Sequence, residues 1–221
     1  MTDEKPDIDM LQKKNIMFKL AVQNLAKRFG ARKVFENINF SLEQGQSIAI
    51  VGPNGSGKST LLKLLIGFSI PTKGKVVFSD NGKPLDFDLY RRRLALISPY
   101  LALYTSLTAR ENLQFLATVN GDLITANEID QVLAQVGLEG RGDDFVVAYS
   151  SGMLQRLKYA AAILKNPAIL MIDEPTSNLD DSGKKIIFDL IDRQRKESII
   201  IIATNEKEDY TLADKLCQLG G

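Results

Sequence analysis

Short, wholly apolar runs recur along the chain, each close to an amphipathic stretch. The segments 47–51 (SIAIV), 168–172 and 198–203 are rich in branched apolar residues and have the length of strands. Such runs have no polar face, which is typical of parallel strands covered on both sides. Helices are predicted over 60–68, after the first run, and over 182–196, between the other two. This alternation predicts an α/β core around a parallel sheet.

A different pattern surrounds the first unit. Residues 18–25 and 75–79 have the composition of strands, and Ile38, Phe40 and Leu42 alternate with polar residues as on a half-buried antiparallel strand. We therefore predict a small antiparallel β subdomain packed on the core.

The middle of the chain is predicted to be helical. Thr108 and Thr125 are each followed three residues later by a glutamate, the capping-box pattern of a helix N-terminus. A third helix is predicted over about 152–165. These helices would form an inserted subdomain at about 99–165.

Composition narrows the class of protein. The 221 residues carry a formal net charge of +1, which gives no support for a nucleic-acid partner, and none is expected. A single cysteine, Cys217, cannot form an internal disulfide, and no apolar stretch approaches the roughly 20 residues of a membrane helix. A cytoplasmic protein is expected. Residues 1–16 have mixed charge and little periodicity, so we predict a flexible tail before a domain at 17–221.

The segment 52–59 (GPNGSGKS) fits the phosphate-loop pattern G-x-x-x-x-G-K-[ST], between the first apolar strand and its helix. Glycines let backbone N–H groups curl around phosphate oxygens at a helix N-terminus, where the dipole favours an anion. Lys58 would reach the β- and γ-phosphates, and the Ser59 hydroxyl would bind Mg²⁺. A glycine-rich turn that serves folding alone is the alternative. The predicted nucleotide-binding residues here are Gly52, Pro53, Asn54, Gly55, Ser56, Gly57, Lys58, Ser59 and Thr60.

Two acids end the apolar run at 168–172. Asp173 is predicted to bind Mg²⁺, directly or through water, and Glu174 to orient or deprotonate the attacking water. The alternative is a helix cap or a solvated acidic turn.

Residues 149–153 (YSSGM), followed by Gln155 and Arg156, lie where the ATP-binding subunits of ABC transporters carry an L-S-G-G-Q signature, and the chain resembles that family from Phe18 to its C-terminus. The segment 177–180 (SNLD) is similar to the family's D-loop. The resemblance implies that Phe29 stacks on adenine and that Asp180 belongs to the nucleotide site. It also implies that Ser150 and Gly152 face the γ-phosphate held by a second subunit. ATP and Mg²⁺ would be bound between two copies, a homodimer that powers a separate transmembrane subunit from the cytoplasmic face of the membrane. A plain helix cap at Ser150 is the alternative.

Two positions depart from the family pattern. Asn205 stands where the family usually has a switch histidine, and the chain contains no histidine. Asparagine can donate a neutral hydrogen bond to the γ-phosphate but carries no proton or charge. Pro99 stands where a glutamine usually contacts Mg²⁺. Ser98 or Tyr100 would supply a hydroxyl there, or the loop would instead dock a membrane subunit; both interpretations stay open.

The predicted function is an ATP-hydrolysing transporter subunit, with Glu174, Lys58 and Asn205 as catalytic residues. The Ser-Ser-Gly-Met signature is most similar to ATP-binding subunits of the haem exporter of cytochrome c maturation, which favours an exporter. The alternatives are a soluble ABC-type ATPase outside transport and a nucleotide-binding regulatory module with weak hydrolysis. Pro99 and Asn205 motivate the module, whereas the intact Lys58, Asp173 and Glu174 argue against it.

Overall fold

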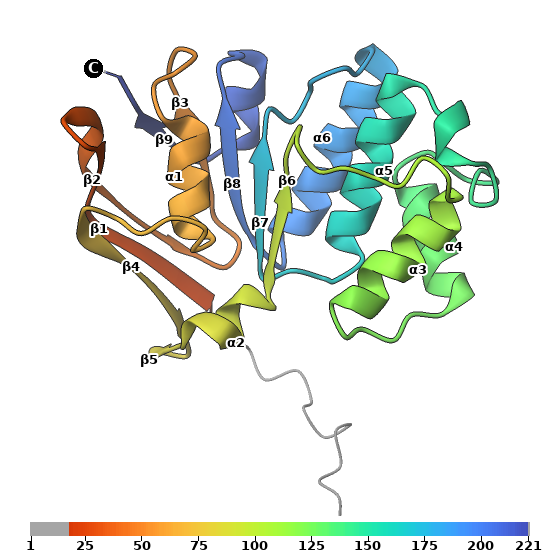
Figure 1. Ribbon diagram of the computed structural model, residues 1–221, viewed down its shortest axis with the longest axis horizontal. Coiled ribbons are helices and arrows are strands. Elements are labelled where there is room, and N and C mark those ends of the chain that lie inside the picture. Colours follow the sequence, from red (N-terminus) through yellow and green to blue (C-terminus); the bar gives the residue numbers. More distant parts are fainter. Residues whose placement is uncertain (1–17, 221) are drawn as a thin grey trace, which may run out of the picture.

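The computed structural model describes residues 18–220, and the predicted tail at 1–16 lies outside this range. Two sheets form the framework, with helices packed between them and on the far side of the larger sheet (Figure 1). The α/β class with a parallel core and an antiparallel subdomain is confirmed.

The larger sheet has five parallel strands in the order β6-β7-β8-β3-β9. Its strands are β6 (Leu94–Ile97), β7 (Ile169–Asp173), β8 (Ile199–Thr204), β3 (Ser47–Val51) and β9 (Lys215–Gln218). The three predicted apolar strands form its centre, two of them displaced by one residue. Strands β6 and β9 were not predicted from the sequence. Both strands have four residues, too few to show a clear period.

Each central strand is covered on both faces. Ile169 and Met171 of β7 pack in the cluster that includes α1 (Lys58–Leu65), whereas Leu170 and Ile172 pack in the cluster that includes α5 (Ser151–Ile163) and α6 (Asp181–Arg195). Successive side chains of a strand point to opposite faces, so a strand between two helical layers is apolar at every position. This explains the continuous apolar runs in the sequence.

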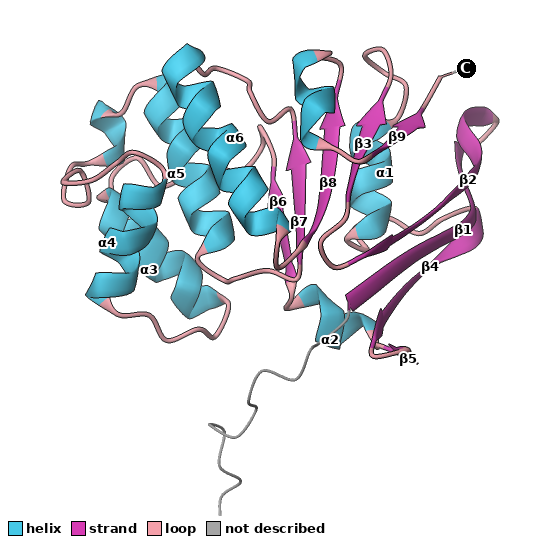
Figure 2. Cartoon of the chain, turned by 180° about the vertical axis from the view of Figure 1, so that it is seen from behind, coloured by secondary structure: helices cyan, strands magenta, loops and turns pink. Residues whose placement is uncertain are grey.

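The smaller sheet is antiparallel, in the order β2-β1-β4-β5. Its strands are β1 (Phe18–Phe29), β2 (Arg32–Glu43), β4 (Lys73–Asp80) and β5 (Lys83–Pro84), followed by the short helix α2 (Phe87–Arg91). All three predicted antiparallel segments lie in it. Helix α1 lies between the two sheets (Figure 2). The prediction of a helix over 60–68 was displaced: α1 begins at Lys58 and ends at Leu65, just before Gly67 takes a φ of +76°.

The helical part contains α3 (Ala109–Val119), α4 (Ala126–Gln135) and α5, with short 3₁₀ helices η2 (Val146–Ala148) before α5 and η3 (Glu208–Leu212) after β8. Both predicted capping boxes form, because the Thr108 and Thr125 hydroxyls accept from the backbone N–H groups of Glu111 and Glu128. Within residues 18–220, none of the helices combines the length and apolar character needed to cross a bilayer.

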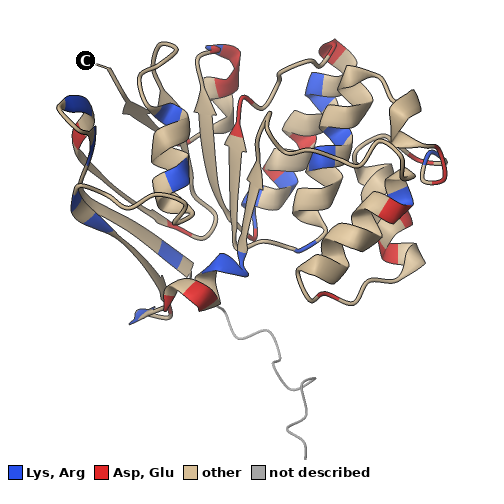
Figure 3. Ribbon diagram, in the orientation of Figure 1, with Lys and Arg blue, Asp and Glu red and all other residues tan. Residues whose placement is uncertain are grey.

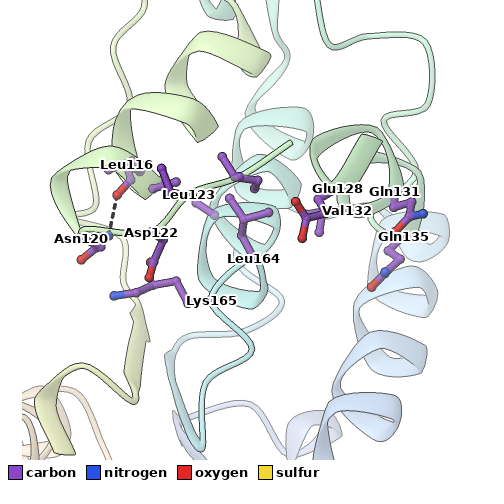
Figure 4. A pocket seen from close by; sticks show the side chains of 13 residues that line it. Leu116, Asn120, Asp122, Leu123, Glu128, Gln131, Val132, Gln135, Leu164 and Lys165 are labelled. Carbon is purple, nitrogen blue, oxygen red and sulfur yellow. Dashed lines mark hydrogen bonds between the residues drawn. The ribbon is translucent and has the colours of Figure 1, made fainter. Parts of the chain in front are cut away.

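A cavity of about 160 Å³ lies between α3, α4 and the end of α5 (Figure 4). It contains none of the site residues predicted from the sequence. Two of its polar groups are already used inside the chain, since the Asn120 amide donates to Leu116 O and the Glu128 carboxylate accepts from Thr125. We assign no ligand to it.

Candidate nucleotide-binding site

Several of the predicted site residues lie where the parallel strands end. The chain leaves β3 into the phosphate loop, β7 into Asp173 and Glu174, and β8 into Asn205. Figure 3 shows acidic residues at the ends of β7 and β8, in the upper part of the view. Ligands of open α/β sheets bind beyond the carboxyl ends of the strands, so this edge is the expected place for a site.

Two glycines of the phosphate loop have backbone conformations and close neighbours that disfavour any side chain. Gly52 and Gly57 have φ angles of +155° and +104°. A Cβ at Gly52 would lie 2.4 Å from Leu219 O, and one at Gly57 would lie 2.5 Å from Val34 Cγ1. The loop therefore needs glycine both for its backbone conformation and for its close approach to neighbouring residues.

Polar groups in this loop are arranged to receive an anion. Lys58 is only 6% exposed, and its Nζ donates to Gly52 O at 2.8 Å and to Pro53 O at 3.4 Å, which holds the ammonium within the loop. Helix α1 has no side-chain cap, so its first backbone N–H groups are not used by its own sequence. The buried Ser56 Oγ has no hydrogen-bond partner in the part of the chain that the structure describes. Unpaired donors at a helix N-terminus fit a phosphate group.

The two acids face this loop from the end of β7. Burial raises the pKa of Asp173, while the Ser59 hydroxyl and the Lys58 ammonium oppose that shift. Burial also raises the pKa of Glu174; Lys58 opposes it and the Asp173 charge adds to it. Glu174 has a φ of +57°, a conformation that non-glycine residues seldom adopt and that is often retained at functional sites.

A cleft of about 370 Å³ joins these groups, and we call it the nucleotide cleft. It is lined by Phe29, Arg32, Val34, Asn54, Gly55, Gly57, Lys58, Ser59, Thr60, Pro99, Tyr100, Asp173 and Glu174. Phe29 is 57% exposed, and Lys27 Nζ lies 4.8 Å from the centroid of its ring. Arg32 and Val34 were not predicted from the sequence as cleft residues. They begin the second strand of the hairpin, in which Arg32 pairs with Phe29.

Other predicted residues do not line the nucleotide cleft. Ser150 is the N-cap of α5 and accepts from Met153 N at 3.2 Å, and Asp180 is the N-cap of α6 and accepts from Gly183 N at 2.8 Å. Gly152 lies against the D-loop, because a Cβ there would be 3.3 Å from Asn178 O. Asn205 is exposed directly after β8. Within one chain, the signature segment (149–153) and the D-loop (177–180) therefore adjoin each other but not the cleft.

The family model described as ABC transporter matches residues 35–177, from β2 through the phosphate loop, the signature segment and both acids. The chain belongs to this family. The ATP-binding subunits of this family, to which the chain corresponds, are ATPases whose hydrolysis of ATP is coupled to transport.

Similarity to individual ABC transporter ATP-binding proteins supports the same family. The chain is 34% identical over 192 residues to the uncharacterized ABC transporter ATP-binding protein YybJ of Bacillus subtilis, covering 86% of this chain and 87% of that protein. It is 32% identical over 189 residues to the lantibiotic transport ATP-binding protein SrtF of Streptococcus pyogenes, covering 84% and 79%. The solved structure of cbiO1 from Clostridium perfringens, described as part of the ABC transporter complex cbiONQ, is similar with a TM-score of 0.77 and 28% identity, covering 90% of this chain and 84% of that one.

The loop around Pro99, one of the two unusual positions of this ABC subunit, lies at the nucleotide cleft. Pro99 and Tyr100 line the nucleotide cleft, so the loop in the glutamine position does reach it. The Ser98 hydroxyl accepts from Tyr100 N at 3.2 Å, and Lys158 of α5 donates to Pro99 O at 3.1 Å. The Tyr100 side chain is 81% exposed, which leaves its hydroxyl and ring accessible to a ligand or a docking partner.

Proposed function

We propose that the chain hydrolyses ATP as a homodimer, with each ATP held between the nucleotide cleft of one copy and the signature segment of the other. The observation that carries this proposal is the separation of the two halves. Lys58, Asp173 and Glu174 share one cleft, whereas Ser150 and Gly152 lie at the start of α5, outside it. A second copy would bring the missing half to the γ-phosphate.

Mg²⁺ is the proposed cofactor, with the Ser59 hydroxyl and the Asp173 carboxylate as its protein ligands. The ion would neutralise charge on the β- and γ-phosphate oxygens. Lys58 would hold the same phosphates, and Glu174 would orient the attacking water and accept its proton. The buried, acid-rich surroundings that raise the pKa of Glu174 favour the role of a base. Asn205 would contribute a neutral hydrogen bond to the γ-phosphate.

A transmembrane subunit is the proposed partner, which would place this chain at the cytoplasmic face of the membrane. Support comes from aromatic side chains beside the Pro99 loop: Tyr100, Tyr104 and Phe115 are 81%, 52% and 42% exposed, and the last two rings form an edge-to-face pair at 5.0 Å. Exposed apolar groups of this kind mark surfaces for protein contact. The form of the signature segment supports export, of the type of the haem exporter.

Complementation between two inactive variants tests the shared site. Lys58→Ala removes the phosphate contact of the cleft, and Gly152→Asp places a carboxylate in the signature segment. In a mixed dimer, one of the two sites combines an intact cleft with an intact signature segment. We expect neither variant to hydrolyse ATP alone and the mixture to recover activity.

The absence of recovery, with both variants folded and wild type active, would contradict a site shared between copies. A wild-type chain without activity at any protein concentration would instead favour the regulatory module, which the departures at Pro99 and Asn205 suggest.

Purification from membranes provides the test of the transmembrane partner. We expect a multi-span membrane protein to accompany the wild-type chain, and less of it to accompany a Tyr104→Ser, Phe115→Ser variant.

A further inference from the structure

A buried carboxylate lies behind the nucleotide cleft, outside the residues discussed so far. Asp209 of η3 is 0% exposed. Its Oδ1 accepts a hydrogen bond from Thr176 Oγ1 at 3.1 Å, and its Oδ2 accepts one from Thr204 Oγ1 at 2.6 Å. Both threonines are themselves buried, so three polar side chains are enclosed together.

The two threonines belong to different loops of the site. Thr176 lies two residues after Glu174, and Thr204 directly precedes Asn205. The loops leave neighbouring parallel strands, since Asp173 of β7 pairs with Ala203 of β8 and Glu174 N donates to Ala203 O at 2.8 Å. One carboxylate therefore joins the loop of the candidate base to the loop of the candidate γ-phosphate sensor.

The surroundings do little to favour a charge at this position. None of the ion pairs found in residues 18–220 includes Asp209, and burial raises its pKa although both threonine hydroxyls oppose the shift. Glu206 and Glu208 add negative charge nearby. The other titratable groups that Asp209 influences are Glu174, Tyr159 of α5 and Lys184 of α6. Within residues 18–220 Asp209 has no cationic partner and is held by the two threonine hydroxyls, so its contacts join two loops and do not neutralise a charge.

A second buried side chain also holds the turn after Glu174. Tyr159 of α5, fully buried, donates its hydroxyl proton to Pro175 O at 3.0 Å. Two separate hydrogen bonds, from Thr176 to Asp209 and from Tyr159 to Pro175 O, therefore limit the movement of the turn by itself. Movement of the Asn205 loop would thus be transmitted to Glu174 through the carboxylate.

We propose that Asp209 is a positioning residue for ATP hydrolysis, which fixes the Glu174 turn and the Asn205 loop relative to each other through Thr176 and Thr204. This role rests on the proposed function, because it assumes that Glu174 acts on the attacking water.

The matched pair Thr176→Val and Thr176→Ser tests the proposal. Valine keeps the size and branching of threonine but cannot donate to Asp209, whereas serine keeps the hydroxyl. We expect Thr176→Val to lower kcat between about tenfold and 100-fold, as small displacements of catalytic groups do, with KM for ATP changed less than about twofold. Thr176→Ser keeps kcat within about twofold of wild type. Rates are divided by the fraction of protein that binds ATP, so partial unfolding does not count as lost turnover.

Hydrogen exchange provides a measurement that does not depend on activity. In Thr176→Val we expect faster amide exchange both in residues 174–178 and in the distant residues 204–209. Unchanged exchange at 204–209, or equal losses of kcat in the valine and serine variants, would overturn the proposal. If wild type itself fails to hydrolyse ATP, the proposed function fails, and exchange at 204–209 still decides whether Asp209 joins the two loops.

Discussion

Helices α1 and α5 begin in opposite ways, although each starts at a predicted phosphate contact. The N-cap of α1 is Gly57, which offers no side chain, so the first N–H groups of the helix stay free. The N-cap of α5 is Ser150, whose hydroxyl already accepts from Met153 N. Helix α1 is thus open to an anion as it stands, while α5 is closed by its own serine.

The other long helices resemble α5 in having a side-chain N-cap. Thr108, Thr125 and Asp180 cap α3, α4 and α6, so among the helices of eight or more residues in 18–220 only α1 lacks a side-chain cap. Helices α1 and α5 also pack on opposite faces of the parallel sheet. The difference suggests a division of tasks, in which α1 binds ATP within one chain and α5 contributes only when a second chain approaches.

Replacing Glu174 with glutamine has the largest expected effect on this division. The amide cannot accept a proton, so we expect hydrolysis to fall about 10²- to 10⁴-fold while ATP binding persists. The ATP-bound dimer, in which α1 of one chain meets α5 of the other, would then accumulate on size-exclusion chromatography. Glu197→Gln is the matched control, because Glu197 is exposed just before β8, at the end of that strand opposite Asn205, and is expected to leave turnover unchanged. Near-normal turnover in Glu174→Gln would refute the assignment of the base.

Alanine substitutions at Gly57 and Gly152 test the N-termini of α1 and α5 separately. In Gly57→Ala the new Cβ meets Val34 Cγ1 at 2.5 Å in a left-handed conformation, which disturbs the phosphate loop and costs about 1–3 kcal/mol in strain. We expect a loss of ATP affinity of about tenfold or more, since 1.4 kcal/mol corresponds to a factor of ten. Gly152 has no positive φ, and a Cβ there would press on Asn178 O of the D-loop at 3.3 Å and would not touch the phosphate loop. We therefore expect ATP binding by the single chain to stay normal and hydrolysis to fall. Equal loss of binding in both, measured by titration with a fluorescent ATP analogue, would remove the distinction.

Local rules account for what the sequence predicted well. The phosphate loop, the two capping boxes and the runs SIAIV and AILMI each depend on residues within one short segment, and each lies within one residue of the predicted place. The runs were informative because a strand buried on both faces must be apolar throughout.

Features that depend on contacts between distant parts of the chain could not be predicted from the sequence. Asp209 looks like one of several acids in the segment EKED, and nothing local shows that it alone is buried against Thr176, 33 residues earlier. Strand β9 carries Lys215 and ends the sheet at its edge, so it lacks the apolar run of a central strand. The position of Ser150 outside the nucleotide cleft likewise depends on the packing of α5, which no motif encodes.

Removing the serine at α5 tests whether its cap also serves the nucleotide. Ser150→Ala removes one hydrogen bond at an exposed helix end, which costs about 1 kcal/mol. In a domain of this size we expect the melting temperature to fall by about 2–4 °C. Thr125→Ala at the start of α4 removes a comparable cap and is the control. Similar melting temperatures with hydrolysis reduced only in Ser150→Ala would assign the serine to the site; equal hydrolysis in both would reduce it to a cap.

The smallest effect concerns α6, whose cap is a carboxylate. The backbone N–H of Gly183, followed by the Ser182 hydroxyl, holds the pKa of Asp180 below its usual value. An acid with a lowered folded-state pKa stabilises the fold above its unfolded pKa, near 3.9, and loses that contribution as pH falls through the lower folded value. The wild-type advantage in melting temperature over Asp180→Asn is therefore expected at pH 6 and should shrink below about pH 4. Asp181→Asn, which leaves the bond to Gly183 intact, serves as control. A difference that stays constant down to pH 3 would show that the carboxylate charge does not stabilise this N-terminus, and α6 would then differ less from α1 than its cap suggests.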